Sequence, residues 1–210
     1  MKKIIISIVL SVVLLICMTA CSEIKIPGLV PGGDITPPVS AKIYEKLDDF
    51  ADINYQQINL DVITVTGGVQ LSANYTLTQS DVIYSVEQLN ILPSDGDFTG
   101  TSTECKTTHT GSAKIVEGKI TEMNNKGITL PSYDELKGNF NFDESNLKNV
   151  VTLGNSLSAD VILPSNFYGS EVNVQNMKIN VEYTETALSK ITITYQTTHS
   201  TVTTTYEFIN

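Results

Sequence analysis

Residue-by-residue alternation of apolar and polar side chains is the feature that most constrains this 210-residue chain. Successive side chains of a β-strand point to opposite faces, so a period of two predicts strands with one face on a core and the other on water. The clearest alternating sets are Val69, Leu71, Ala73, Tyr75 and Leu77 against Gln70, Ser72, Asn74 and Thr76; Ile179, Val181 and Tyr183 against Asn180 and Glu182; Ile191, Ile193 and Tyr195 against Thr192 and Thr194; and Val202, Tyr206 and Phe208 against Thr203, Thr205 and Glu207.

Turn and cap residues divide the chain into elements. Gly67-Gly68 between two alternating runs predicts a two-residue hairpin. Apolar residues at helical spacing predict a helix over 41–51 with Ser40 as its cap, and Ser132 with Glu135 forms a capping box before Gly138. Asp143 is expected to cap a further turn to about Asn149. Strands are predicted at 58–66, 69–78, 82–89, 106–109, 112–121, 156–163, 172–184, 189–197 and 201–209, with a loop at 92–103 and a turn at 166–169.

Eight or nine such strands present a broad apolar face, while few residues are predicted to be helical. The predicted fold class is therefore mainly β (α+β). We favour a single curved antiparallel sheet or half-barrel, covered by one N-terminal helix and one or two short mid-chain helices. A β-sandwich is the alternative, because two sheets also cover each other's apolar faces.

The N-terminal region has the composition of an export signal. Lys2 and Lys3 precede an apolar run, and small residues follow it up to Cys21. The predicted organisation is a signal peptide at 1–20, a lipidated Cys21 with a Pro/Gly-rich tether at 21–39, and a single β-rich domain at 40–210. A permanent membrane helix over the same apolar run is the alternative, since 17 residues is the lower limit for crossing a bilayer.

Thr19-Ala20-Cys21 resembles the lipobox of bacterial lipoproteins, in which small residues precede an obligatory cysteine. Met18 stands where leucine is commonest. The resemblance implies cleavage before Cys21 and a diacylglyceryl group on its sulfur. The expected location is the extracytoplasmic face of the cell membrane, with an outer membrane or the cell surface as alternatives, because Ser22 resembles an outward sorting signal.

Composition excludes one class of function. The chain has 23 acidic residues against 13 basic ones, for a net charge of −10, and contains no arginine. Nucleic-acid affinity depends on basic side chains that displace counterions. We therefore expect no nucleic-acid partner; the expected partners are the membrane, through the diacylglyceryl group on Cys21, and either a lipid or an envelope protein.

No residue cluster indicates catalysis, a cofactor or a metal. Cys105 and His109 lie four residues apart in a threonine-rich segment expected to be a strand, where their side chains are too distant for a shared reaction. The two Thr-Thr-His triplets, ending at His109 and His199, lack metal-ligand spacing. We therefore expect no cofactor and no metal ion.

The order of predicted elements resembles the lipoprotein-carrier superfamily that includes LolA, LppX and RseB-like proteins. The shared features are an initial helix at 40–51, a meander beginning with Ile58-Asn59-Leu60-Asp61-Val62, mid-chain helices and closing strands. This resemblance implies a half-barrel with a concave apolar face that holds acyl chains. The candidate ligand-facing residues are Leu71, Tyr75, Val181, Ile191, Ile193, Tyr206 and Phe208.

Three functions follow in order of preference. The first is a membrane-anchored extracytoplasmic lipoprotein that acts as a non-catalytic binding or interaction module. The second is a carrier of a lipid or other amphiphile in the concave face, and the third is a hydrolytic enzyme. The absence of tryptophan argues against a sugar-stacking platform, and the nine tyrosines are expected mainly in the core.

Overall fold

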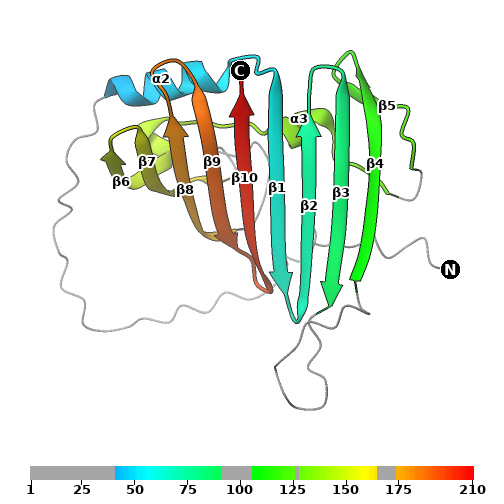
Figure 1. The fold of residues 1–210 in the computed structure, drawn as a ribbon. Coiled ribbons are helices and arrows are strands. Elements are labelled where there is room, and N and C mark those ends of the chain that lie inside the picture. The colour runs from blue at the N-terminus through cyan, green and yellow to red at the C-terminus, as the bar shows by residue number, and fades with distance from the viewer. Residues whose placement is uncertain (1–40, 91–105, 126–127, 165–173) are drawn as a thin grey trace.

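The computed structural model describes residues 41–90, 106–125, 128–164 and 174–210. The chain is mainly β, as predicted, and forms one open antiparallel sheet of ten strands (Figure 1). The strand order is β5-β4-β3-β2-β1-β10-β9-β8-β7-β6, so the sandwich alternative is wrong. The strands are β1 (Gln57–Thr66), β2 (Val69–Leu77), β3 (Asp81–Asn90), β4 (Lys106–Val116), β5 (Lys119–Thr121), β6 (Leu147–Leu153), β7 (Ser156–Val161), β8 (Gln175–Tyr183), β9 (Leu188–Gln196) and β10 (Ser200–Ile209).

Two meanders meet at the centre of the sheet. The strands β1 to β5 run in sequence order to one edge, and β10 to β6 run in reverse order to the other. The meanders join where β1 pairs with β10 over ten residue pairs, from Gln57↔Ile209 to Thr66↔Ser200. The first and last strands of the domain thus form the middle of the sheet.

Short helical elements within the described ranges accompany the sheet. They are α2 (Ala41–Ala51), α3 (Tyr133–Lys137) and the 3-10 helix η2 (Glu144–Asn146). Two of the three predicted caps are confirmed: Ser132 and Glu135 form the capping box of α3, and the side chain of Asp143 accepts a hydrogen bond from the Ser145 N–H at the start of η2. The third, Ser40, lies outside the described residues. Figure 1 views the sheet from the side opposite α3.

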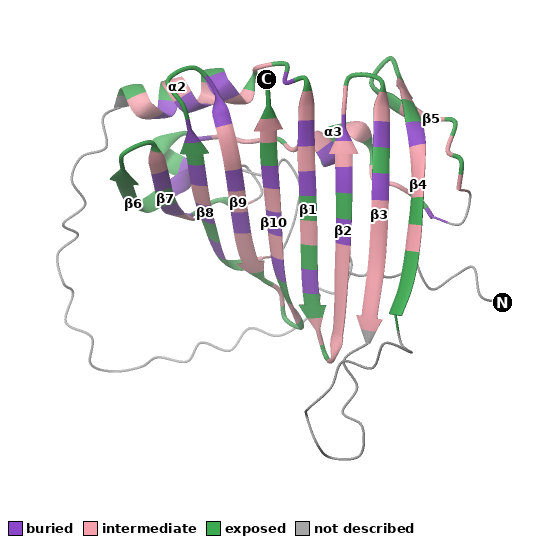
Figure 2. Ribbon diagram, in the orientation of Figure 1, coloured by how far each residue is buried: buried purple, intermediate pink, exposed green. Residues whose placement is uncertain are grey.

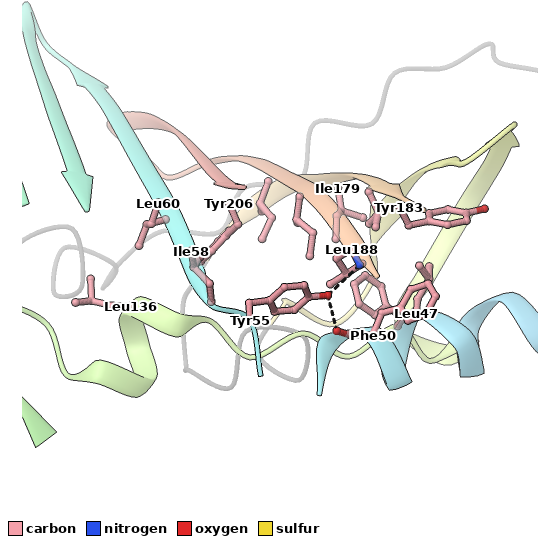
Figure 3. Close-up of a cluster of buried hydrophobic side chains, with 14 of the residues drawn as sticks. Leu47, Phe50, Tyr55, Ile58, Leu60, Leu136, Ile179, Tyr183, Leu188 and Tyr206 are labelled. Carbon is pink, nitrogen blue, oxygen red and sulfur yellow. Dashed lines mark hydrogen bonds between the residues drawn. The ribbon is translucent and has the colours of Figure 1, made fainter. Parts of the chain in front are cut away.

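We call the sheet face that carries the buried side chains the inner face, and the opposite face the outer face. Alternation along each strand produces the two faces, as the purple and green bands of Figure 2 illustrate. Tyr206 of β10 and Leu60 of β1 are cross-strand partners on the inner face, and both join a cluster that includes Leu47 of α2 and Leu136 of α3 (Figure 3).

Two stretches differ from the sequence-based expectation. The turn capped by Asp143 ends at Asn146, and a strand that was not predicted, β6, follows it. A bulge between Lys148 and Val151 places the buried residues Leu147 and Val150 three positions apart, which conceals the strand period. In the first meander, the sequence predicts a break in the strand at 110–111. The structure shows instead that β4 continues through Gly111 and that the chain turns at Glu117-Gly118.

Several predictions fall on residues outside the described ranges. These are the signal peptide, Cys21, the tether with the Ser40 cap, the loop at 92–103, Cys105 and the turn at 166–169. Within the described ranges, no helix has both the length and the apolar character needed to span a bilayer.

Candidate binding surface

The predicted ligand-facing residues all lie on the inner face. Their exposed fractions are 0% for Val181, Ile191 and Ile193, 1% for Tyr206 and 5% for Tyr75. Leu71 and Phe208 are half-buried. The strand alternation therefore assigned each of these residues to the correct side of the sheet.

The protein's own aromatic rings lie against this part of the inner face. Phe140, which follows α3, meets Tyr206 edge-on with ring centroids 5.0 Å apart, and Tyr55 contacts Phe208 at 4.7 Å. The Tyr55 hydroxyl donates to the Phe50 carbonyl and accepts from the Leu188 N–H, so it links the end of α2 to β9 (Figure 3). The half of the inner face nearest α2 and α3 is thus packed by side chains of the chain itself.

Two polar atoms on the inner face have no hydrogen-bond partner among the described residues. They are the Tyr84 hydroxyl on β3 and His109 Nε2 on β4, and both atoms are buried. Tyr84 is the cross-strand partner of Gly111, where an added Cβ would lie 2.3 Å from the hydroxyl oxygen. The glycine in β4 therefore makes room for the tyrosine ring.

The outer face carries a continuous row of short polar side chains across eight adjacent strands. Each residue of the row is the register partner of the next, from β7 at one end to β4 at the other. None of them is buried. We call this set the polar row: Ser158, Asn180, Thr192, Thr205, Asp61, Asn74, Ser85 and Thr110.

Longer side chains flank part of the polar row. Two residues further along the strands on the same face, Glu182, Lys190 and Glu207 lie on one side of the row, and Lys178 and Ile63 lie on the other. No aromatic side chain lies on the outer face of the described strands. The surface therefore offers hydroxyl, amide and carboxylate groups without an aromatic platform.

The outer face is hollowed at both ends of the polar row. One open hollow of about 300 Å³ is lined by Ser158, Asn180 and Thr192 together with Asp160 and Lys178. The other, of about 510 Å³, is lined by row residues of β2, β3 and β4 and by their neighbours Thr76, Ile83 and Ser112. The two hollows together include six of the eight row residues, and Thr205 and Asp61 lie between them.

Hydrogen bonds and charges organise the row. The Ser158 hydroxyl donates to the side-chain amide oxygen of Asn180, Oδ1, at 2.8 Å. The sheet displaces water from the Asp61 carboxyl and raises its pKa, and the negative charge of Glu207 raises it further. Lys190, 3.7 Å from Glu207, opposes this effect. Asp61 is the only row residue with an ionisable side chain, so the row is nearly neutral on a strongly acidic chain.

The histidines are not brought together. His109 lies on β4 and His199 lies in the turn before β10, with β3, β2 and β1 between those two strands. In the part of the chain that the structure describes, no three His, Cys, Asp or Glu side chains are grouped closely enough to hold a metal ion.

Neither a scan against known protein families nor a search of curated proteins found a match for the chain. Sequence alternation assigned Asn74, Asn180, Thr192 and Thr205 to the water-facing side, but the polar row was missed, because its alignment depends on the register of strands distant in sequence.

Proposed function

We propose that this protein is a membrane-anchored extracytoplasmic lipoprotein that acts as a non-catalytic binding module, and that its contact surface is the outer face of the sheet. The contrast between the two faces carries this proposal. On the inner face the predicted ligand-facing residues are mostly buried within the core cluster, whereas the polar row and its two hollows are open to water.

The anchor is the sequence-based part of the proposal. An export signal followed by Thr19-Ala20-Cys21 supports a thioether-linked diacylglyceryl group on the cysteine. Two acyl chains hold a protein on a bilayer stably, whereas one gives only marginal binding. The Pro/Gly-rich tether at 21–39 would then separate the domain from the lipid surface.

The anchor is tested by labelling cells with palmitate. We expect label on the full chain and none on the Cys21→Ser variant, while a Cys105→Ser variant keeps the label and serves as the matched control. Protease added to intact cells or spheroplasts should digest the domain if it is extracytoplasmic. Equal labelling of the Cys21→Ser variant would contradict the proposal.

A carrier of a lipid or amphiphile, within a half-barrel as the resemblance implies, is the second candidate. One set of observations favours it: Val86, the cross-strand partner of His109, is half-buried on the inner face two residues along β3 from Tyr84, and the Tyr84 hydroxyl and His109 Nε2 have no partner among the described residues. Such a mixture of apolar and polar groups suits an amphiphile. Native mass spectrometry of the full chain extracted in a mild detergent should then detect a bound lipid, and a lipid-free protein would argue against this candidate.

A further inference from the structure

The two edges of the sheet differ in how their backbone is covered. At one edge, β5 has only three residues; beyond it Asn124 both donates to and accepts from the Ser112 backbone, and the Asn125 amide donates to the Thr110 carbonyl. At the other edge, no described residue outside β7 makes a hydrogen bond to the backbone of residues 148–153. An uncovered edge strand can pair with a further strand. The edge formed by β6 is therefore where one can be added.

The second half of β6 is also apolar on its exposed side. The bulge at Asn149 and the exposed Lys148 protect the first half of the strand from further pairing. Beyond the bulge, Val151 and Leu153 are 57% and 83% exposed, and Leu153 is the most exposed large apolar side chain of the described ranges. Both lie on the outer face, where Val151 is the register partner of Ser158. A strand with apolar residues at matching positions would cover them.

The sequence supplies such a segment directly after the predicted anchor. Residues 22–26 read Ser-Glu-Ile-Lys-Ile, in which polar and apolar side chains alternate, and Pro27 ends the pattern. A period of two is typical of a strand with one covered face. We propose that residues 22–26 pair with the second half of β6 and extend the sheet by one strand; this inference rests on the proposed anchor.

The segment complements the edge in side-chain pattern and charge. Ile24 and Ile26 fall on one face of the added strand, where they pack beside the two exposed apolar side chains of β6. Glu23 and Lys25 fall on the other face and carry opposite charges. The segment is therefore neutral and is not repelled by the acidic chain.

The connection to the described domain starts on the correct side and is long enough. The N-terminal end of α2, in blue, lies at the β6 side of the sheet (Figure 1). Tyr44 in the first turn of α2 is buried, which raises its pKa, and the carboxylate of Glu144, three residues before β6, raises it further. The 14 residues from 27 to 40 span up to about 46 Å, whereas β6 is about 23 Å long. The segment can therefore reach the edge.

Pairing at this edge orients the module on the bilayer. Cys21 directly precedes the paired segment, so its acyl chains enter the membrane beside β6. The polar row, which begins on β7, then runs away from the lipid surface. Residues 27–40 become a connection within the domain, so a short fixed link replaces the free tether of the proposed function.

Hydrogen exchange of the detergent-solubilised full chain, measured by mass spectrometry, tests the pairing. We expect slow exchange in residues 22–26 and in the second half of β6. Lys25→Pro removes a backbone N–H from the middle of the added strand and should speed exchange in both segments at least about tenfold. Ile35→Pro, a matched change in the connection, should leave both unchanged. Fast exchange of residues 22–26 in the unaltered chain would overturn the inference.

Disulfide cross-linking identifies the occupant of the edge. In a Cys105→Ser background, Ile24→Cys combined in turn with Val151→Cys and Leu153→Cys should give an intramolecular disulfide in at least one combination, because cross-strand neighbours lie within disulfide range. Ile24→Cys with Lys119→Cys, on the opposite edge of the sheet, should give none. Disulfide-linked dimers of the Leu153→Cys variant, with no intramolecular product in either combination, would overturn the inference in favour of a second copy of the chain.

The outcome is separable from that of the proposed anchor. Palmitate labelling reports on Cys21, and hydrogen exchange reports on residues 22–26. A labelled protein in which these residues exchange fast would overturn the pairing alone. Slow exchange there, in a protein whose label does not depend on Cys21, would overturn the anchor alone.

Discussion

Two buried tyrosine hydroxyls differ in their hydrogen bonding. The Tyr55 hydroxyl makes two hydrogen bonds, of 2.8 Å to the Phe50 carbonyl and 2.9 Å from the Leu188 N–H. The Tyr84 hydroxyl has no partner among the described residues, although the residue is only 2% exposed. Removing the Tyr55 hydroxyl therefore measures the contribution of two hydrogen bonds to stability, and removing the Tyr84 hydroxyl measures the cost of burying a hydroxyl without a partner.

We expect Tyr55→Phe to lower the free energy of unfolding by about 1–3 kcal/mol, because it leaves the buried Leu188 N–H unpaired. The Phe50 carbonyl loses one of its two donors and still accepts from the Ile53 N–H. Tyr84→Phe removes a desolvated hydroxyl and should leave the stability unchanged or raise it. Denaturant unfolding followed by circular dichroism measures both. A loss for Tyr84→Phe as large as that for Tyr55→Phe would show that the Tyr84 hydroxyl has a partner.

Burial of tyrosine also predicts the alkaline limit of stability. Desolvation raises the pKa of Tyr75 from 10.0 to about 12, with a further contribution from Tyr84, and it also raises the pKa of Tyr44, Tyr55 and Tyr84. Between pH 10 and pH 12 the buried tyrosine hydroxyls keep their protons in the folded state, whereas the same hydroxyls lose them in the unfolded state. The stability that these tyrosines contribute is therefore fully present below pH 10 and falls as the pH rises towards 12.

A denaturation series from pH 8 to pH 12 tests this expectation, with tyrosinate absorbance recorded in parallel. The unfolding midpoint should stay level up to about pH 10 and then decline, and part of the tyrosinate signal should appear only on unfolding. Titration of every tyrosine near pH 10 in a still-folded protein would contradict the buried positions.

At the scale of elements, a single carboxylate links α2 to the segment that precedes η2. Asp48 of α2 accepts a 3.0 Å hydrogen bond from the Phe142 N–H, and Phe142 is fully buried in the core. The neighbouring Asp49 is exposed. The two residues are therefore a matched pair on one helix.

Asp48→Ala should lower the free energy of unfolding by about 1–2 kcal/mol, since a partly buried N–H loses its acceptor. Asp49→Ala should change it by less than about 0.5 kcal/mol, as is usual for exposed residues. Thermal unfolding of the two variants gives the comparison. Equal effects would show that helix composition, and not the link to Phe142, determines the stability of this region.

Elements with strong local signals were predictable from sequence, and elements shaped by neighbours were not. The Gly67-Gly68 hairpin and the α3 capping box depend on residues adjacent in the chain, and both were predicted correctly. The strand β6 was missed because the bulge at Asn149, with φ of 52°, changes the spacing of its buried residues. Gly111 lies within β4 and not at a strand break, because the absence of a side chain there accommodates Tyr84 from the next strand.

At the scale of the whole molecule, alternation predicted a water-facing side but not the polar row. The row exists because β1 pairs with β10 in one particular register, so that Asp61 lies beside Thr205. These residues are distant in sequence, and a slip of one residue would place Asp61 on the inner face. Non-local register is thus the information that a single sequence did not supply.

We propose that ligand meets the outer face, while the inner face forms the core. Methyl-group NMR of the full chain in detergent micelles compares the two faces of a single strand, β9. Thr192 lies in the polar row on the outer face, and its neighbours Ile191 and Ile193 are fully buried on the inner face. A soluble paramagnetic chelate should broaden the Thr192 and Thr205 methyl signals, and a short-chain phospholipid should leave those of Ile191 and Ile193 in place. Shifts of the isoleucine methyl signals on addition of the phospholipid would contradict this arrangement and favour a carrier with its ligand on the inner face.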